Sequence, residues 1–202
     1  MKLYRREKYL SRIRPFYHDT DLIKVITGIR RCGKSSLMQT ISEELLESGV
    51  KEENILFYNL DKYGYRNIKT AEAFENLLFG EKREVDIKYI FIDEIQNVKG
   101  FEPVLEALRL EEGYSIFITG SNSYLLSGEL ATKLTGRYLE FELQTLGFDE
   151  YEDMKRFYGK KADTDMIREF DSYLIGGGFP RALFYEELSE KQLYVRSVLE
   201  DI

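Results

Sequence analysis

Two glycines, a lysine and a serine in TGIRRCGKSSL, residues 27–37, have the types and spacing that hold a polyphosphate. Glycines let consecutive backbone N–H groups turn inward around an anion. Lys34 adds a positive charge that reaches the β- and γ-phosphates, and the Ser35 hydroxyl has the right size to ligate Mg²⁺. The stretch therefore predicts a phosphate-binding loop lined by Gly28, Ile29, Arg30, Arg31, Cys32, Gly33, Lys34, Ser35 and Ser36.

The residues around the loop support this interpretation. The apolar run LIKVIT precedes it as a buried strand, and an amphipathic pattern follows it as a helix. The positive end of that helix would point at the same anion. The side chains of Arg30, Arg31 and Cys32 are expected to turn away from the phosphates, the arginines solvated or locally paired and the cysteine a small filler. The alternative is a glycine turn that only caps a helix.

A pair of acids ends a second apolar run, YIFIDEIQ, residues 89–96. Because a parallel sheet gathers ligand groups at the carboxyl ends of its strands, Asp93 is expected to hold the hydration shell of Mg²⁺ opposite Ser35. Glu94 can accept a proton from a water aimed at the γ-phosphate. The pair favours hydrolysis over transfer to a second substrate, which would need a pocket that excludes water. The alternative is an exposed acidic turn.

Short apolar runs that alternate with helical patterns are the elements that must position these residues. Strand and helix in turn are typical of a parallel sheet covered by helices. The sequence therefore predicts an α/β fold with a parallel five-stranded sheet flanked by helices. Strands are expected at 22–27, 54–60, 88–93, 115–120 and 137–143, and helices at 34–48, 70–80, 101–110 and 127–134.

The pattern changes after Leu146, where strands cease and three helical segments follow at 148–158, 165–175 and 189–202. We therefore expect two parts, an α/β core over 1–146 and a small helical lid over 147–202. The sequence ends inside an apparent helix, SVLEDI, so the lid is expected to be truncated at its C-terminal end.

Composition limits the class of protein. The chain has 202 residues, 43% hydrophobic and 14% aromatic, enough for one domain with a core and a small appendage. Its net charge of −7 gives no support for nucleic-acid binding but leaves room for a local basic patch. The single cysteine fits a reducing compartment, and no signal peptide or membrane-spanning run is visible, which predicts a cytoplasmic protein.

Taken in order, the motifs give the sequence a family resemblance. ITGIRRCGKSSL, YIFIDEIQ, FITGSNSYLL, LTGRYLEFEL followed by GFDEYE, and GGGFPRAL run from residue 26 to 184. The chain resembles P-loop ATPases of the AAA+ superfamily, closest to prokaryotic members with a poorly characterised domain after the ATPase module. The first two motifs, Walker A and Walker B in that family, are shared by many ATPases, whereas the last three are more specific.

The resemblance implies a strand order and further site residues. The strand ending near Gly120 would lie between the phosphate-loop strand and the Asp93 strand. Asn122 or Ser121 would then be the sensor 1 residue that bonds to the γ-phosphate or the attacking water, with a helix N-cap as the alternative. Arg137 matches the arginine finger that reaches the nucleotide of a neighbouring subunit. The alternative for Arg137 is a surface arginine paired with an acid.

The motif GGGFPRAL resembles the glycine–proline motif in the lid of related signalling ATPases. By that analogy Pro180 would pack on adenine and Arg181 would act as a sensor 2 arginine that reaches the phosphates. The glycines would allow the lid to rotate when the nucleotide changes. The alternative is a loop between two helices with Arg181 in solvent.

The resemblance implies ATP and Mg²⁺ as cofactors and a homo-oligomer formed through Arg137. The leading hypothesis is a Mg²⁺-dependent ATPase whose lid and oligomeric state respond to ATP. A second is a nucleotide-gated switch with negligible turnover and an unknown protein partner, which the acidic charge suits better than DNA. A third is a small-molecule kinase, although the sequence shows no acceptor-binding constellation.

Overall fold

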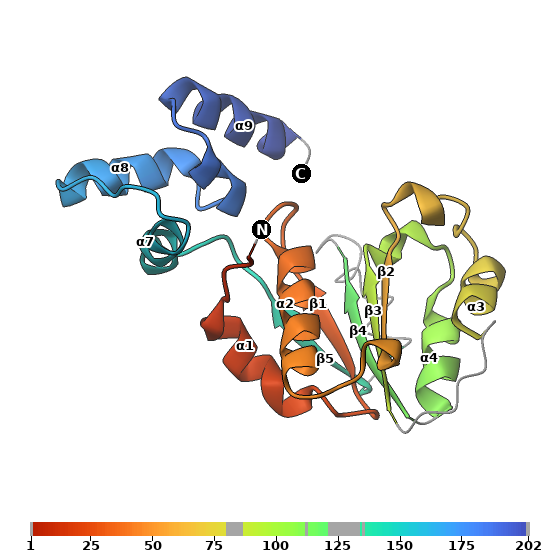
Figure 1. Ribbon diagram of the computed structural model, residues 1–202. Coiled ribbons are helices and arrows are strands. Elements are labelled where there is room, and N and C mark those ends of the chain that lie inside the picture. The colour runs from red at the N-terminus through yellow and green to blue at the C-terminus, as the bar shows by residue number, and fades with distance from the viewer. Residues whose placement is uncertain (1, 80–86, 112, 121–133, 135, 201–202) are drawn as a thin grey trace.

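A parallel five-stranded sheet forms the centre of the molecule (Figure 1). The computed structural model describes residues 2–79, 87–111, 113–120, 134 and 136–200. Its strands, in the spatial order β2-β3-β4-β1-β5, are β1 (Ile23–Thr27), β2 (Ile55–Asn59), β3 (Lys88–Asp93), β4 (Tyr114–Thr119) and β5 (Tyr138–Glu142). All four pairings are parallel, and β4 lies between β1 and β3, which confirms the implied strand order.

The register of the sheet brings the carboxyl ends of four strands together. Strands β1 and β3 are buried along their full lengths, as expected for apolar runs covered on both faces. Asn59 pairs with Asp93, and Ile26 pairs with Thr119. The carboxyl ends of β2, β3, β4 and β1 therefore meet at one edge of the sheet, where the phosphate loop begins.

Among the described residues, two helices pack on each face of the sheet (Figure 1). Side chains alternate along each strand, so that Ile26 and Phe91 face one core, whereas Val25 and Ile92 face the other. The first core is completed by α1 (Glu7–Ile13) and α2 (Lys34–Glu47), and the second by α3 (Ala71–Phe79) and α4 (Glu102–Leu110). The helices predicted at 34–48, 70–80 and 101–110 match α2, α3 and α4 within one residue at each end.

Several short elements carry too few residues to leave a pattern in the sequence. Helix α1 was not predicted, because it has only 7 residues in a highly charged segment. Short 3₁₀ helices occur at Arg14–Phe16 (η1), Glu52–Asn54 (η2), Tyr63–Tyr65 (η3), Ile95–Asn97 (η4) and Pro180–Phe184 (η5). The helix expected at 127–134 lies outside the described residues, apart from Leu134, which is in a turn.

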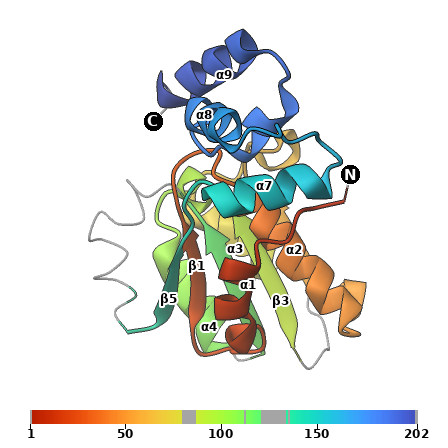
Figure 2. The ribbon, with the colours of Figure 1, turned by 90° about the vertical axis from the view of Figure 1, so that its left-hand side faces the viewer.

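Three C-terminal helices lie above the edge of the sheet that carries the phosphate loop (Figure 2). They are α7 (Phe148–Phe157), α8 (Met166–Gly176) and α9 (Leu188–Glu200). We call α7, α8, η5 and α9 together the C-terminal helices. The structure differs from the expected loop between α8 and α9 by containing η5, in which Pro180 takes the first position.

Candidate functional site

The loop that follows β1 depends on glycine at its first position. Gly28 has a φ of 147°, and a Cβ there would lie 2.3 Å from the Leu143 carbonyl oxygen and 2.8 Å from the Cys32 Sγ. Gly33 has a φ of 110° and is the residue before α2. Glycine adopts such conformations without steric cost. The loop therefore turns tightly between strand and helix, as the motif predicts.

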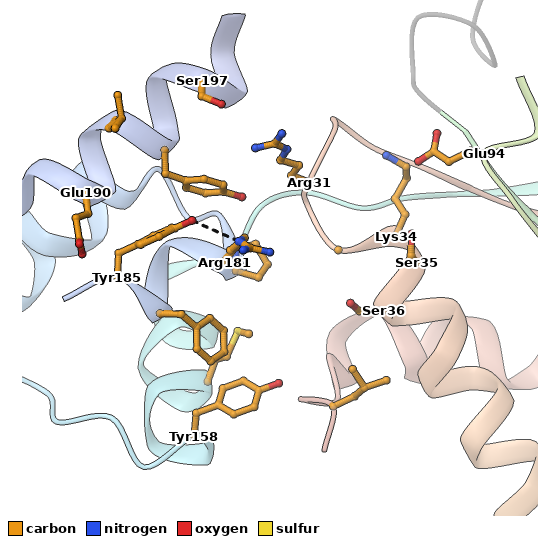
Figure 3. A pocket seen from close by; sticks show the side chains of 17 residues that line it. Arg31, Lys34, Ser35, Ser36, Glu94, Tyr158, Arg181, Tyr185, Glu190 and Ser197 are labelled. Carbon is orange, nitrogen blue, oxygen red and sulfur yellow. Dashed lines mark hydrogen bonds between the residues drawn. The ribbon is translucent and has the colours of Figure 1, made fainter. Parts of the chain in front are cut away.

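Lys34, at the end of the loop, is hydrogen-bonded to the first two residues of the loop. It is the first residue of α2, and its side chain is buried. Its Nζ donates to the carbonyl oxygens of Gly28 at 2.9 Å and Ile29 at 3.2 Å. Figure 3 shows the side chain of Lys34 extending from the start of α2 toward Glu94. The charge that a phosphate would meet is thus held at the centre of the loop.

Two side chains from neighbouring strands hold the acid pair. Asp93 is fully buried, with Oδ1 accepting from the Thr119 hydroxyl at 2.6 Å and Oδ2 accepting from Asn59 Nδ2 at 2.8 Å. The same Thr119 hydroxyl accepts from the backbone N–H of Glu94 at 2.9 Å. Sequence reasoning did not identify Asn59 or Thr119. The strand order implied by the resemblance was the signal that could have placed Thr119 beside Asp93.

Glu94 leaves the strand in an unusual backbone conformation. Its φ of 62° and ψ of 51° are left-handed, which turns the chain sharply at the end of β3. The side chain lines the cleft beside the loop, and its Oε2 accepts a hydrogen bond from Gln96 Nε2. Glu94, the acid expected to act as a base, is therefore presented to the cleft, while Asp93 is fully buried.

The phosphate loop and the C-terminal helices enclose a cleft of about 1360 Å³ (Figure 3). This exceeds the 300–1,000 Å³ or so that is typical of small-molecule pockets. Arg31, Gly33, Lys34, Ser35, Ser36 and Glu94 line it on the core side, and Met154, Tyr158, Pro180, Arg181, Phe184 and Tyr185 on the other. A polar, cationic floor thus faces a wall rich in aromatic side chains.

Both residues predicted from GGGFPRAL lie at this cleft. Pro180 packs next to the loop, since its Cγ lies 3.8 Å from the position that a Cβ on Gly33 would take. Arg181 is exposed, and its Nε donates to the Tyr185 hydroxyl at 3.4 Å. Gly178 is required by close packing, because its Cβ would lie 2.6 Å from the Leu146 carbonyl oxygen.

The other side chains of the loop, Cys32, Arg30 and Arg31, lie in three different environments. The Cys32 side chain is buried against Gly28, and burial raises the pKa of its thiol, so it acts as a small filler. Arg30 is exposed and is absent from the lining of the cleft. Arg31 instead lines the cleft, with its guanidinium 5.6 Å from the centre of the Tyr194 ring. Its side chain thus meets the C-terminal helices, which position alone did not indicate.

Arg137 lies at the amino-terminal ends of the strands, whereas the loop lies at their carboxyl ends. Its carbonyl oxygen accepts from Ile23 N at the start of β1, and four residue steps of strand, about 13 Å, separate this end from Thr27. Its side chain is half exposed and donates to Glu106. Within one chain Arg137 is therefore a surface arginine paired with an acid. Ser121 and Asn122 lie outside the described residues.

The donors for a cation are few. Among the described residues no three His, Cys, Asp or Glu side chains gather as a metal site. Ser35 lines the cleft, whereas Asp93 is fully buried and is not among the residues that line it. Mg²⁺ commonly takes one or two protein ligands and completes its shell with phosphate oxygens and water. The two residues fit a cation that enters with a polyphosphate.

A strand, a glycine turn and a helix that starts with lysine, facing acids at the end of a neighbouring strand, are typical of P-loop nucleotide-binding proteins. The family follows from comparison with known proteins. Residues 20–152 match the family model described as AAA domain, and the chain belongs to this family. Family and fold together make it a nucleotide-binding module of the AAA+ ATPase class.

Two curated relatives are longer than this chain. It is 40% identical over 184 residues to an uncharacterized protein of Haemophilus influenzae, covering 90% of the chain and 45% of the relative. It is 32% identical over 186 residues to one of Methanocaldococcus jannaschii, covering 89% of the chain and 40% of the relative. The chain thus spans less than half the length of these relatives.

Solved structures share the fold at low sequence identity. The Saccharomyces cerevisiae Hsp104–casein complex superposes with a TM-score of 0.55 and 15% identity, over 97% of this chain and 37% of Hsp104. The Aeropyrum pernix ORC1 protein in complex with DNA gives a TM-score of 0.52 and 14% identity, over 78% of this chain and 50% of its own. In the described part of the chain, no helix combines the length and apolar character needed to cross a membrane.

Proposed function

We propose that the chain binds ATP with Mg²⁺ in the cleft and hydrolyses it to ADP and phosphate. The observation that carries the proposal is that Lys34 and Glu94 line one cleft, at the point where the glycine loop meets the start of α2. The loop amides and the positive end of α2 suit a polyphosphate. A carboxylate beside them suits a water that attacks the terminal phosphorus.

Ser35 and Asp93 are the residues that would hold Mg²⁺. Each Asp93 oxygen accepts one hydrogen bond from Thr119 or Asn59, so each keeps a lone pair for a water in the cation's shell. When bound, the cation neutralises charge on the β- and γ-phosphates. Lys34 would stabilise the charge that develops on the same oxygens.

Glu94 would act as the general base. A water placed between its carboxylate and the γ-phosphate gives up a proton to the glutamate as its oxygen bonds to phosphorus, and the bond from phosphorus to the β-phosphate oxygen breaks. The hydrogen bond from the Glu94 backbone N–H to the Thr119 hydroxyl fixes the position of the Glu94 backbone, from which the side chain extends. Gln96 holds one carboxylate oxygen, which leaves the other to face the water.

The C-terminal helices would serve as a lid over the adenine of the bound nucleotide. Pro180 lies beside Gly33, and the aromatic rings of Tyr158 and Phe184 line the same wall of the cleft, which suits a flat apolar ring such as adenine. Arg181 lies on the same wall, and to act on the phosphates it would have to leave the Tyr185 hydroxyl and turn toward the loop. Closure of such helices would exclude water other than the attacking one.

Arg137 would act on a second copy of the chain. Because it lies at the far edge of the sheet from its own cleft, a role as arginine finger requires association. Turnover per chain would then rise with protein concentration, and a dilute chain would bind ATP as a switch with little turnover. Rates of phosphate release measured over a hundredfold range of concentration, about 0.5–50 μM, test this point.

Two substitutions test the proposal as a whole. Lys34→Ala should abolish binding of MgATP measured by titration calorimetry, because it removes the ammonium from the loop. Glu94→Gln should bind MgATP as the parent does but release no phosphate, because an amide cannot accept the proton. Glu72→Gln, at an exposed position of α3, is the matched control. Phosphate release by Glu94→Gln at the parent rate would refute the assignment of the base.

A further inference from the structure

Arg6, the residue before α1, is a buried arginine whose guanidinium contacts several distant segments. It is 6% exposed and lies 4.6 Å from the centre of the Tyr9 ring. Two of its hydrogen bonds go to Glu150, from Nε to Oε1 at 2.8 Å and from Nη2 to Oε2 at 2.7 Å. The others go to the backbone carbonyl oxygens of Cys32 at 3.3 Å, Gln144 at 2.8 Å and Thr145 at 3.2 Å.

These partners belong to the three parts that would have to move together in an ATPase. Cys32 is in the phosphate loop, Gln144 and Thr145 are in the connection from β5 to α7, and Glu150 is in the first turn of α7. A guanidinium has five N–H donors, and the five hydrogen bonds use all of them. Arg6 is therefore fully occupied at the junction of loop, connection and C-terminal helices.

Glu150 gives the motif GFDEYE a physical role. Besides the ion pair, its Oε2 accepts from the backbone N–H of Gly147 at 3.2 Å, which caps the start of α7. One carboxylate thus fixes both the beginning of the helix and the guanidinium. The N-terminal segment also reaches the far end of α7, where the Tyr158 hydroxyl donates to the Lys2 carbonyl oxygen at 3.2 Å.

The hydrogen bond from Arg6 to Cys32 bears directly on the phosphate site. The Cys32 carbonyl and the Gly33 N–H belong to one planar trans peptide, so they point in opposite directions. Holding the carbonyl toward Arg6 turns the Gly33 N–H away from it. Gly33 lines the cleft, and its amide is one of those that a loop of this type aims at phosphate.

We propose that Arg6 is a positioning residue for the phosphate loop, and that its ion pair with Glu150 couples the orientation of the Gly33 amide to the position of the C-terminal helices. Bound phosphates would favour the orientation in which the Cys32 carbonyl meets Arg6. That orientation in turn favours the position of α7 in which Glu150 completes the pair. This inference rests on the proposed nucleotide function of the cleft and adds a route by which nucleotide moves the lid.

Binding of MgADP tests the inference without turnover. Arg6→Lys keeps the charge but cannot make the five hydrogen bonds, so the Kd for MgADP should rise about tenfold, as loss of a charge-assisted hydrogen bond predicts. Glu150→Gln keeps the shape of the side chain and should raise the Kd in the same direction by less. Arg14→Lys is the matched control, because Arg14 makes a similar two-bond pair with Glu44, away from the phosphate loop.

A spectroscopic readout separates positioning from general destabilisation. In ¹H–¹⁵N spectra, the Gly33 amide resonance should shift in Arg6→Lys and Glu150→Gln but not in Arg14→Lys. Equal Kd values for Arg6→Lys and the control, or an unmoved Gly33 resonance, would overturn the inference while leaving the proposed function intact. A parent chain that binds no MgADP would overturn both. If Arg6→Lys fails to fold, Glu150→Gln decides by the same two measurements.

Discussion

Replacing Thr119 with valine removes a hydroxyl that contacts both acids of the cleft, and its effect can be worked out from two bonds. The hydroxyl donates to Asp93 Oδ1 at 2.6 Å and accepts from Glu94 N at 2.9 Å. A hydrogen bond to a carboxylate contributes about 1.5–3 kcal/mol, and a polar group left without its partner costs about 1–3 kcal/mol. Because the two losses share one atom, we expect Thr119→Val to lower the free energy of unfolding by about 3 kcal/mol.

The matched variant Thr119→Ser keeps the hydroxyl and loses only a buried methyl group, for about 1 kcal/mol. Urea denaturation of the two variants should therefore differ by about 2 kcal/mol in unfolding free energy. Without its hydrogen bond to Thr119, Glu94 loses its fixed position relative to the attacked phosphate. We expect kcat to fall about 10–100-fold in Thr119→Val, with the Kd for MgATP within about threefold of the parent.

Two results would refute this reasoning. Equal destabilisation by serine and valine would show that the hydroxyl of Thr119 contributes no more to stability than its methyl group does. A parent value of kcat in Thr119→Val would show that the hydroxyl does not position Glu94 for the reaction. Titration calorimetry with MgATP measures the Kd of each variant and so separates an effect on kcat from a loss of binding.

Three further predictions address other parts of the molecule. Gly28→Ala should lower the unfolding free energy by about 2–4 kcal/mol and abolish MgATP binding, because its Cβ would lie 2.3 Å from the Leu143 oxygen; retained affinity in calorimetry would contradict the loop geometry. Burial lowers the pKa of Lys24 to about 7, below its ordinary value, so above pH 7 the unfolded state binds more protons and this residue makes stability rise with pH. Lys24→Met should flatten that rise, by up to about 1.4 kcal/mol per pH unit, in denaturation curves at pH 7 and 9, and curves that keep the parent's slope would argue against it. Arg137→Ala should change the unfolding free energy by less than about 1 kcal/mol, because its ion pair is half exposed, yet lower phosphate release per chain at high protein concentration; equal rates at every concentration would exclude a finger.

Local patterns in the sequence were sufficient for the elements that hold the phosphate loop. The predicted strand 88–93 coincides with β3, because six buried residues between polar segments form a pattern that does not depend on the rest of the chain. The helix after Gly33 was likewise predicted from its first residue, since the loop motif fixes where it begins. The strand order required the resemblance to a family, because neighbours in a parallel sheet are separated along the chain.

Contacts between distant segments could not be predicted in this way. Thr119 is the last residue of an apolar run, and only the pairing of β4 with β3 brings its hydroxyl to Asp93. Arg6 is one of several basic residues near the N-terminus, and its burial depends on the connection between β5 and α7 passing beside it. The short and charged helix α1 was missed for a related reason, because its apolar side chains become a pattern only against the sheet.

Backbone geometry is a second observation, independent of any sequence motif, that supports the cleft as the functional site. In the described part of the chain, Arg31 and Glu94 are the residues other than glycine with positive φ, at 64° and 62°. A left-handed conformation costs such residues about 1–2 kcal/mol and persists only where the surroundings impose it. Both side chains line the cleft, from opposite sides of the loop lysine. Glycine would adopt this conformation at the end of β3 at less cost, whereas the proposed general base requires a carboxylate at that position.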